Sequence, residues 1–184
     1  MKLSLITPPA VLPVTLAQAK MQSRVLGDQE DTLIETYLAA ATAELDGPTG
    51  VIGKCFMTQT WRLELAGWLG PVALRVEPVA SMEVRYLDAA GDEQVLSGAS
   101  WLLDDDVARS PRLHWRGPLP VLGSHPWPVI IDITAGHAQA QPDVQVAILM
   151  RAAELYEQRE AMTVGAVQTS AAFDAIVSNL RRKL

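Results

Sequence analysis

Cysteine is almost absent from this 184-residue chain, and histidine is scarce. The single cysteine, Cys55, excludes an internal disulfide and any zinc site built from several cysteines. The three histidines, His114, His125 and His137, include no pair at i+3 or i+4, the spacing that places two metal ligands on one helix face. We therefore expect neither a metal nor a cofactor.

Long apolar runs are also absent, although hydrophobic residues make up 49% of the chain. A membrane-spanning helix needs roughly 20 consecutive apolar residues, and no run approaches that length. Residues 1–9 carry one lysine and a short apolar run that two prolines stop, which is too little for a signal-peptide core. We expect no membrane contact and synthesis in the cytoplasm.

Catalytic motifs are missing as well. The carboxylates at 104–106 lack the alternating ligands, glycine and later glutamate of a calcium loop, so a solvated turn is expected. The glycines between 47 and 53 lack the Lys-Ser/Thr pair of a phosphate loop and follow a helical pattern. No serine lies in a nucleophile elbow. A net charge of -6 argues against general nucleic-acid binding. These absences favour a structural protein over an enzyme.

Apolar residues recur at helical spacing in four segments, residues 16–25, 28–45, 143–160 and 170–184. Between the second and third lie several short stretches with the alternation of strands, and all five tryptophans. The strand candidates are 55–65, 72–76, 82–87, 94–96, 101–103, 113–115 and 129–134. Trp61, Leu63 and Leu65 should share a buried face. The pattern predicts an α+β fold, a small bundle of about four helices with an inserted antiparallel β-sheet sub-domain.

The predicted organisation has four parts. They are an extended N-terminal arm (1–14), a helical bundle (15–50 and 142–162), the β-rich insertion (51–141), and a linker with a C-terminal helix (163–184).

The third helix is too apolar for one buried stripe. Ten of the thirteen residues from 144 to 156 are apolar or aromatic, so burial nearly all round is expected, inside the domain or against a neighbouring subunit. The residues predicted to form a subunit interface are Val146, Leu149, Met150, Ala153 and Tyr156.

The last helix carries an apolar stripe and a basic tip. The stripe has the spacing i, i+3, i+4, i+7, i+11 and consists of Phe173, Ile176, Val177, Leu180 and Leu184. The cations Arg181, Arg182 and Lys183 either complete the helix dipole or belong to a docking helix. For a docking helix, Leu180→Asp with Leu184→Asp should leave the fold intact and abolish attachment to the partner. The stripe could equally bind its own domain.

Short motifs along nearly the whole chain resemble those of one family. They are Thr7-Pro8-Pro9-Ala10 and residues 13–20, 31–34, 58–61, 86–88, 134–136, 147–149 and 156–161. In this order and spacing they resemble the head–tail connector (adaptor) proteins of long-tailed bacteriophages, which also occur in prophages and gene transfer agents. Relatives often have a proline in the link after the third helix, and residues 163–172 have none.

The resemblance implies a homo-oligomeric ring, expected to be a dodecamer, in the virion or phage-like particle. Such a ring lies beneath the portal protein and extends a channel through which DNA passes without sequence-specific binding. It also receives stopper or tail-terminator proteins. The C-terminal segment of the family tends to reach the portal. Carried over to this chain, the portal-binding residues are Phe173, Ile176, Val177, Leu180, Arg181, Arg182, Lys183 and Leu184.

Two alternatives remain open at this point. The chain could be another connector of the same particle, such as a stopper or tail-completion protein, although stoppers are expected to be mainly β-barrel. It could also be a small cytoplasmic enzyme with a pocket in the tryptophan-rich sheet, which would require polar residues converging in a deep pocket.

Overall fold

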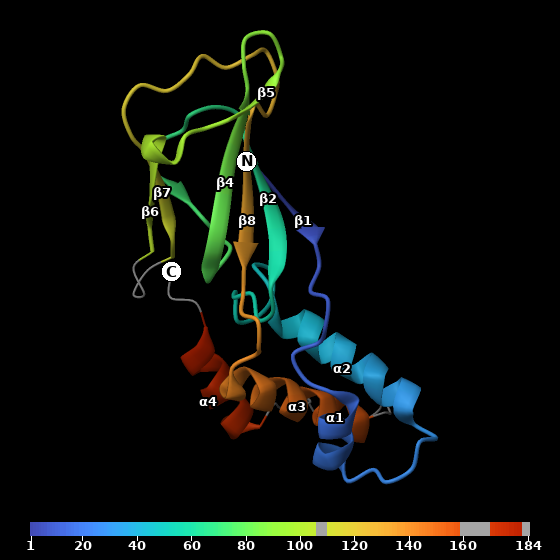
Figure 1. The fold of residues 1–184 in the computed structure, drawn as a ribbon. Coiled ribbons are helices and arrows are strands. Elements are labelled where there is room, and N and C mark those ends of the chain that lie inside the picture. The colour runs from blue at the N-terminus through green and yellow to red at the C-terminus, as the bar shows by residue number, and fades with distance from the viewer. Residues whose placement is uncertain (106–109, 159–169, 182–184) are drawn as a thin grey trace. The chain divides into compact units, whose positions relative to one another are not determined.

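A computed structural model describes residues 1–105, 110–158 and 170–181, and the chain divides into two compact units (Figure 1). The sheet unit comprises Met1–Ala10 and Thr58–His137. The helical unit comprises Val11–Met57 and Ala138–Arg181. Four helices and antiparallel sheets confirm the predicted α+β class.

The helical unit contains the four predicted helices with slightly different ends. They are α1 (Leu16–Ser23), α2 (Asp31–Leu45), α3 (Pro142–Glu157) and α4 (Ala171–Leu180). Thr15 and Gln18 form a capping box at the start of α1. Pro142 occupies the first turn of α3, where its missing N–H costs no hydrogen bond. The predicted linker at 163–169 lies outside the described residues.

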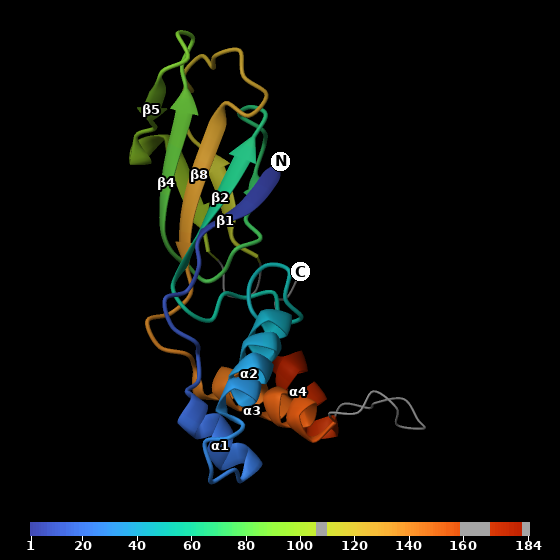
Figure 2. The same cartoon turned by 90° about the vertical axis from the view of Figure 1, so that its right-hand side faces the viewer.

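Helix α3 is the centre of the helical unit and contacts α1, α2 and α4 (Figure 2). Its buried side is formed by Val144, Ala147, Ile148 and Ala152. On the opposite side Val146 is 45% exposed. Within one protomer, α3 is therefore fully buried on one side only. The burial on nearly all sides that its composition led us to expect is not reached inside a single chain.

The sheet unit contains two antiparallel sheets. The larger has the order β1-β2-β8-β4-β5 and the smaller the order β3-β7-β6. Their bounds are β1 (Lys2–Thr7), β2 (Gln59–Leu65), β3 (Val72–Ala73), β4 (Val79–Leu87), β5 (Glu93–Val95), β6 (Trp101–Asp104), β7 (Arg112–Trp115) and β8 (Val129–Ala135), with a short 3₁₀ helix η1 (Gly98–Ser100) before β6.

The larger sheet has one apolar and one polar face, as alternation along its strands requires. Leu63 pairs with Ile131, which pairs in turn with Val84, and all three are buried. Leu63 and Leu65 confirm the predicted buried face of β2, whereas Trp61 is only half-buried.

Strand β1 is a difference from the sequence expectation. The first residues were expected to form an extended arm, and Lys2–Thr7 are indeed extended, but they pair with β2 as the edge strand of the larger sheet. Leu3 lies opposite Leu63. Nothing local marks this pairing, because its partner lies sixty residues along the chain.

The C-cap of α1 offers a test of local strain. Arg24 ends the helix at φ 56°, the left-handed conformation that costs a non-glycine residue roughly 1 kcal/mol. We expect Arg24→Gly to raise the free energy of unfolding by up to about 1 kcal/mol, measured by urea denaturation. Ser23→Gly, one residue earlier inside the helix, is the control and should lower it by about 0.5–1 kcal/mol. Equal effects of the two variants would contradict the strain argument.

Candidate assembly surfaces

The described part of the chain does not bring metal ligands together. No group of three or more His, Cys, Asp or Glu side chains there could hold a metal ion. His114 Nε2 lies 4.0 Å from Asp104, and His125 Nδ1 accepts a hydrogen bond from the backbone of Trp127. No described helix is long and apolar enough to cross a membrane.

One open hollow lies in the sheet unit, with a volume of about 350 Å³. Its lining consists of Ala66, residues 122–126 and Pro128. Ser124 and His125 are its hydroxyl and imidazole side chains, and the lining contains no carboxylate. The lining therefore offers a hydroxyl and an imidazole but no carboxylate to orient the imidazole, which a Ser-His-Asp triad requires.

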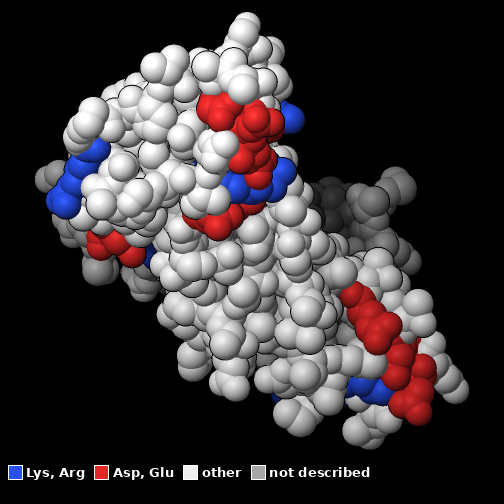
Figure 3. Space-filling model, turned by 45° about the horizontal axis from the view of Figure 1, so that its top comes forward, with Lys and Arg blue, Asp and Glu red and all other residues white. Residues whose placement is uncertain are grey.

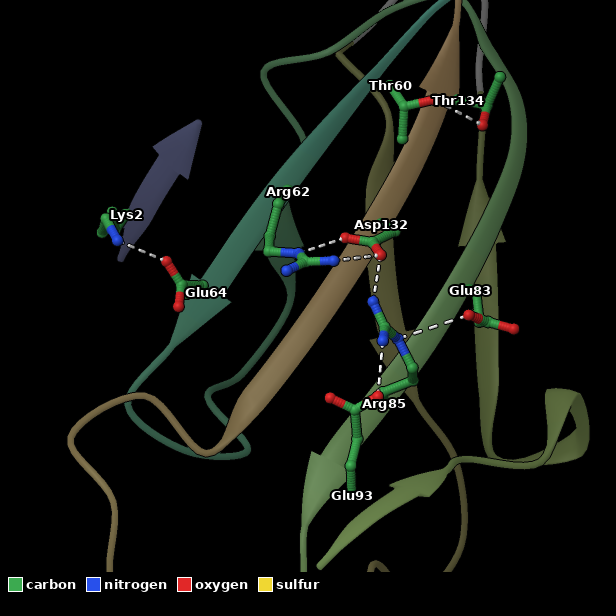
Figure 4. A network of polar contacts seen from close by, with 9 residues as sticks. All are labelled: Lys2, Thr60, Arg62, Glu64, Glu83, Arg85, Glu93, Asp132 and Thr134. Carbon is green, nitrogen blue, oxygen red and sulfur yellow. Dashed lines mark hydrogen bonds and ion pairs between the residues drawn. The ribbon is translucent and has the colours of Figure 1, made fainter. Parts of the chain in front are cut away.

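The polar face of the larger sheet carries a network of paired charges (Figure 4). Asp132, in the middle of β8, accepts hydrogen bonds from Arg62 Nε at 2.7 Å and Arg62 Nη2 at 2.9 Å. Arg85 binds the same carboxylate from the other side and reaches Glu93 Oε1 at 2.6 Å. These side chains lie on β2, β8, β4 and β5, so the network links four neighbouring strands of the sheet.

The electrostatic balance at Asp132 favours its ionised form. Burial raises the pKa of its carboxyl, but the hydrogen bond from Arg62 and the charges of Arg62 and Arg85 outweigh this, so the pKa lies below its ordinary value. A lowered pKa in the folded state stabilises the fold at pH values above the unfolded pKa of about 3.9. This contribution is lost as pH falls through the folded value.

Asp132→Asn should therefore lower the free energy of unfolding by about 2–3 kcal/mol at pH 7, because two arginines lose a shared carboxylate. Denaturant titrations at several pH values should show the difference from wild type shrinking below pH ~4. Glu83→Gln is the control. Glu83 is 59% exposed and makes one 3.4 Å ion pair with Arg85, so its change should stay within about 0.5 kcal/mol. A pH-independent difference at position 132 would contradict the electrostatic cause.

Polar contacts also fasten the helical unit. Arg151 on α3 binds Glu44 of α2 at 2.7 Å and Glu154 at 3.2 Å. The Tyr156 hydroxyl donates to the carboxylate of Glu30, just before α2.

In the view of Figure 3, acidic and basic side chains lie beside one another in clusters, without a broad basic face.

The apolar stripe of α4 packs into the helical unit itself. Phe173, Val177 and Leu180 are 5%, 7% and 8% exposed and belong to the core. Ile176 packs against that core, and Arg181 Nε donates to the carbonyl of Val51 at 3.0 Å. Arg182, Lys183 and Leu184 lie outside the described residues. In this conformation the stripe binds its own unit, and portal binding by this segment stays a prediction.

The predicted interface residues of α3 divide into two kinds. Leu149, Met150 and Tyr156 are partly buried and pack against the core, whereas Val146 is exposed and Ala153 is half-buried. At helical spacing these five positions lie on the side of α3 away from its most buried residues, here called the outward side, although the core partly covers three of them.

Sequence reasoning missed the network around Asp132. The available signal was a charged residue in the middle of an otherwise apolar strand, with Arg62 and Arg85 at mid-strand positions of two other segments. A buried strand rarely carries an unpaired charge, so three such residues indicate mutual pairing.

Three solved structures similar to the chain come from gene transfer agent particles. "Neck of empty GTA particle computed with C6 symmetry" matches at 29% identity with a TM-score of 0.78. "Virion of native gene transfer agent (GTA) particle" matches at 29% identity with a TM-score of 0.79. "Neck of native GTA particle computed with C12 symmetry" matches at 30% identity with a TM-score of 0.72. Each match covers 100% of this chain and 97% of the matched chain in the similar structure. No protein-family model and no curated protein matches.

Proposed function

We propose that this chain, a head–tail structural protein similar over its full length to neck proteins of gene transfer agent particles, is the head–tail adaptor of a phage-like particle. The observation that carries the proposal is the full-length similarity. All of this chain and 97% of each neighbour's chain are covered, so both units have counterparts in a neck component. Its place would be the head–tail connector of the particle, after synthesis in the bacterial cytoplasm.

A homo-oligomeric ring fits the symmetry of the related assemblies, two of which were computed with C6 and C12 symmetry. Copies related by rotation need a head-to-tail contact between two different surfaces. We assign one of these surfaces to the outward side of α3, formed by Val146, Leu149, Met150, Ala153 and Tyr156. A neighbouring copy would complete the burial that α3 lacks in one protomer.

The proposed partners are the portal protein on one side of the ring and a stopper or tail-terminator protein on the other. We place the portal contact at the C-terminal segment. If the portal takes the apolar stripe itself, α4 must leave the helical unit and uncover Phe173, Val177 and Leu180. A net charge of -6 suits a channel through which DNA slides without being held.

Binding to the portal tests the adaptor position against the other connector positions. Purified chain is mixed with portal-bearing heads that lack all other neck proteins, and co-sedimentation is measured. An adaptor binds these heads directly. A stopper or tail-completion protein binds only after the adaptor is added, and that result would overturn the proposal.

Val146→Asp should abolish ring formation on the portal while leaving the thermal midpoint within a few degrees of wild type. The exposed side chain is 45% accessible, so a carboxylate there costs the protomer little but would be desolvated in the ring. Negative-stain microscopy measures the rings. Val121→Asp, at a valine of the sheet unit that is 79% exposed, is the matched control expected to retain them. Normal rings of Val146→Asp would exclude this surface.

A further inference from the structure

Both edges of the larger sheet are open in the described residues. Strand β1 pairs only with β2 and β5 only with β4 there. Leu5 and Ile6 of β1 are 43% and 47% exposed, and Val95 of β5 is 66% exposed. An edge strand presents unpaired backbone N–H and C=O groups, and an apolar one tends to pair with another strand. β1 is six residues long and pairs regularly with β2 from Lys2 to Leu5, so its free edge offers a continuous stretch of backbone to a second strand.

Topology makes these two edges suited to each other in a ring. All four neighbouring pairs are antiparallel, so in a sheet of five strands β1 and β5 run in the same direction. A copy rotated about a ring axis can place its β1 beside β5 of the preceding copy as a parallel pair. Pairing β1 with β1 antiparallel requires a two-fold axis and closes a dimer, which cannot grow into a ring.

The charges on the polar face support the same pairing. Lys2 on β1 pairs with Glu64 at 2.9 Å, and Arg85 pairs with Glu93 of β5 at 2.6 Å. The face therefore ends in a cation at one edge and an anion at the other (Figure 4). Lys2 and Glu93 remain 60% and 46% exposed, so each has room for a second partner. Joining β5 to β1 would bring these opposite charges together.

We propose that β5 of one copy pairs in parallel with β1 of the next, so that the five-stranded sheets join edge to edge into one continuous sheet around the ring. The occupant of each edge is a second copy of this chain. This inference rests on the proposed ring and adds a contact in the sheet unit to the α3 contact in the helical unit.

Cross-linking tests the pairing. Ser4 lies opposite Arg62 and Val95 opposite Arg85, so both belong to the polar face. The double variant Ser4→Cys, Val95→Cys is assembled on portal complexes and then treated with a short bismaleimide. This reagent joins the two cysteines in more than one register of the paired strands. The native Cys55 is 1% exposed, so the wild type is the reagent control. The double variant should give covalent species from dimer up to the full ring on a denaturing gel. Each single variant lacks one half of the contact and should give no ladder.

The outcomes separate this inference from the function. Rings seen by negative stain without a ladder in the double variant would overturn the edge pairing and leave the adaptor function standing. A cross-link from either cysteine to the portal or to another neck protein would also overturn it, because a different molecule would occupy the edge. No ring under any condition would overturn the proposed ring and this contact with it.

Charge reversal gives an independent readout. Lys2→Glu and Glu93→Lys should each reduce the yield of rings, and the combined variant should restore it by re-forming the pair between copies. Glu83→Lys is the matched control. Glu83 pairs with the same Arg85 but lies on β4, inside the sheet, so its reversal should leave the ring yield unchanged. A combined variant no better than the single ones would count against the contact.

Discussion

Leu180→Asp is expected to lower the free energy of unfolding of the helical unit by at least about 3 kcal/mol. The side chain is 8% exposed and belongs to the core formed with α3, so a carboxylate there would lose both packing and hydration. All five tryptophans lie in the sheet unit. Far-UV circular dichroism therefore reports loss of helix, while tryptophan fluorescence reports the sheet unit separately.

Ala175→Asp is the control for this prediction, because it places the same charge on the exposed side of the same helix. Its effect should stay within about 0.5 kcal/mol. If Leu180→Asp keeps full helicity and wild-type stability while losing portal attachment, α4 is a free docking helix and its packing in the protomer is not significant in solution.

Gly50→Ala should destabilise the helical unit by about 2–4 kcal/mol. A Cβ at this position would lie 2.3 Å from the carbonyl oxygen of Asp46 and 2.5 Å from that of Leu45. These are backbone atoms, so they cannot move aside as a flexible side chain can. The clash would open the loop that folds back on the end of α2, where Ile52 donates to Leu45 and is 2% exposed.

Gly27→Ala is the matched control in the same unit, since a Cβ there meets nothing within 4 Å. Its free energy of unfolding, measured by urea denaturation with circular dichroism as the signal, should lie within about 0.5 kcal/mol of wild type. Equal stability of Gly50→Ala and wild type would show that the loop relaxes freely, and the close approach at Gly50 would then have no structural weight.

Much of the fold follows from local patterns. The helix starts at Thr15 and Pro142 are marked by a capping box and an N1 proline, and helical periodicity predicted α1 to α4. Strands β4 and β5, which pair antiparallel, were predicted from the alternating segments 82–87 and 94–96. These features depend on neighbours within a few residues, which a sequence displays directly.

The unpredicted parts depend on contacts between distant residues. Arg62 and Asp132 are 70 positions apart, and Asp132 and Arg85 are 47 apart, so their pairing could not be derived from spacing. The pairing of β1 with β2 could not be derived either, because the two strands are about sixty residues apart. The stripe of α4 showed that Phe173 and Leu180 must be buried but did not show against what, because an apolar stripe fits its own core or a partner equally well.

The most direct test of the adaptor assignment is cryo-electron microscopy of this chain mixed with portal complexes from the same genome. We predict a symmetric ring of this chain on the narrow end of the portal, with neighbouring copies in contact along α3. Portal complexes without added density, or density that forms only once another neck protein is present, would contradict the adaptor position.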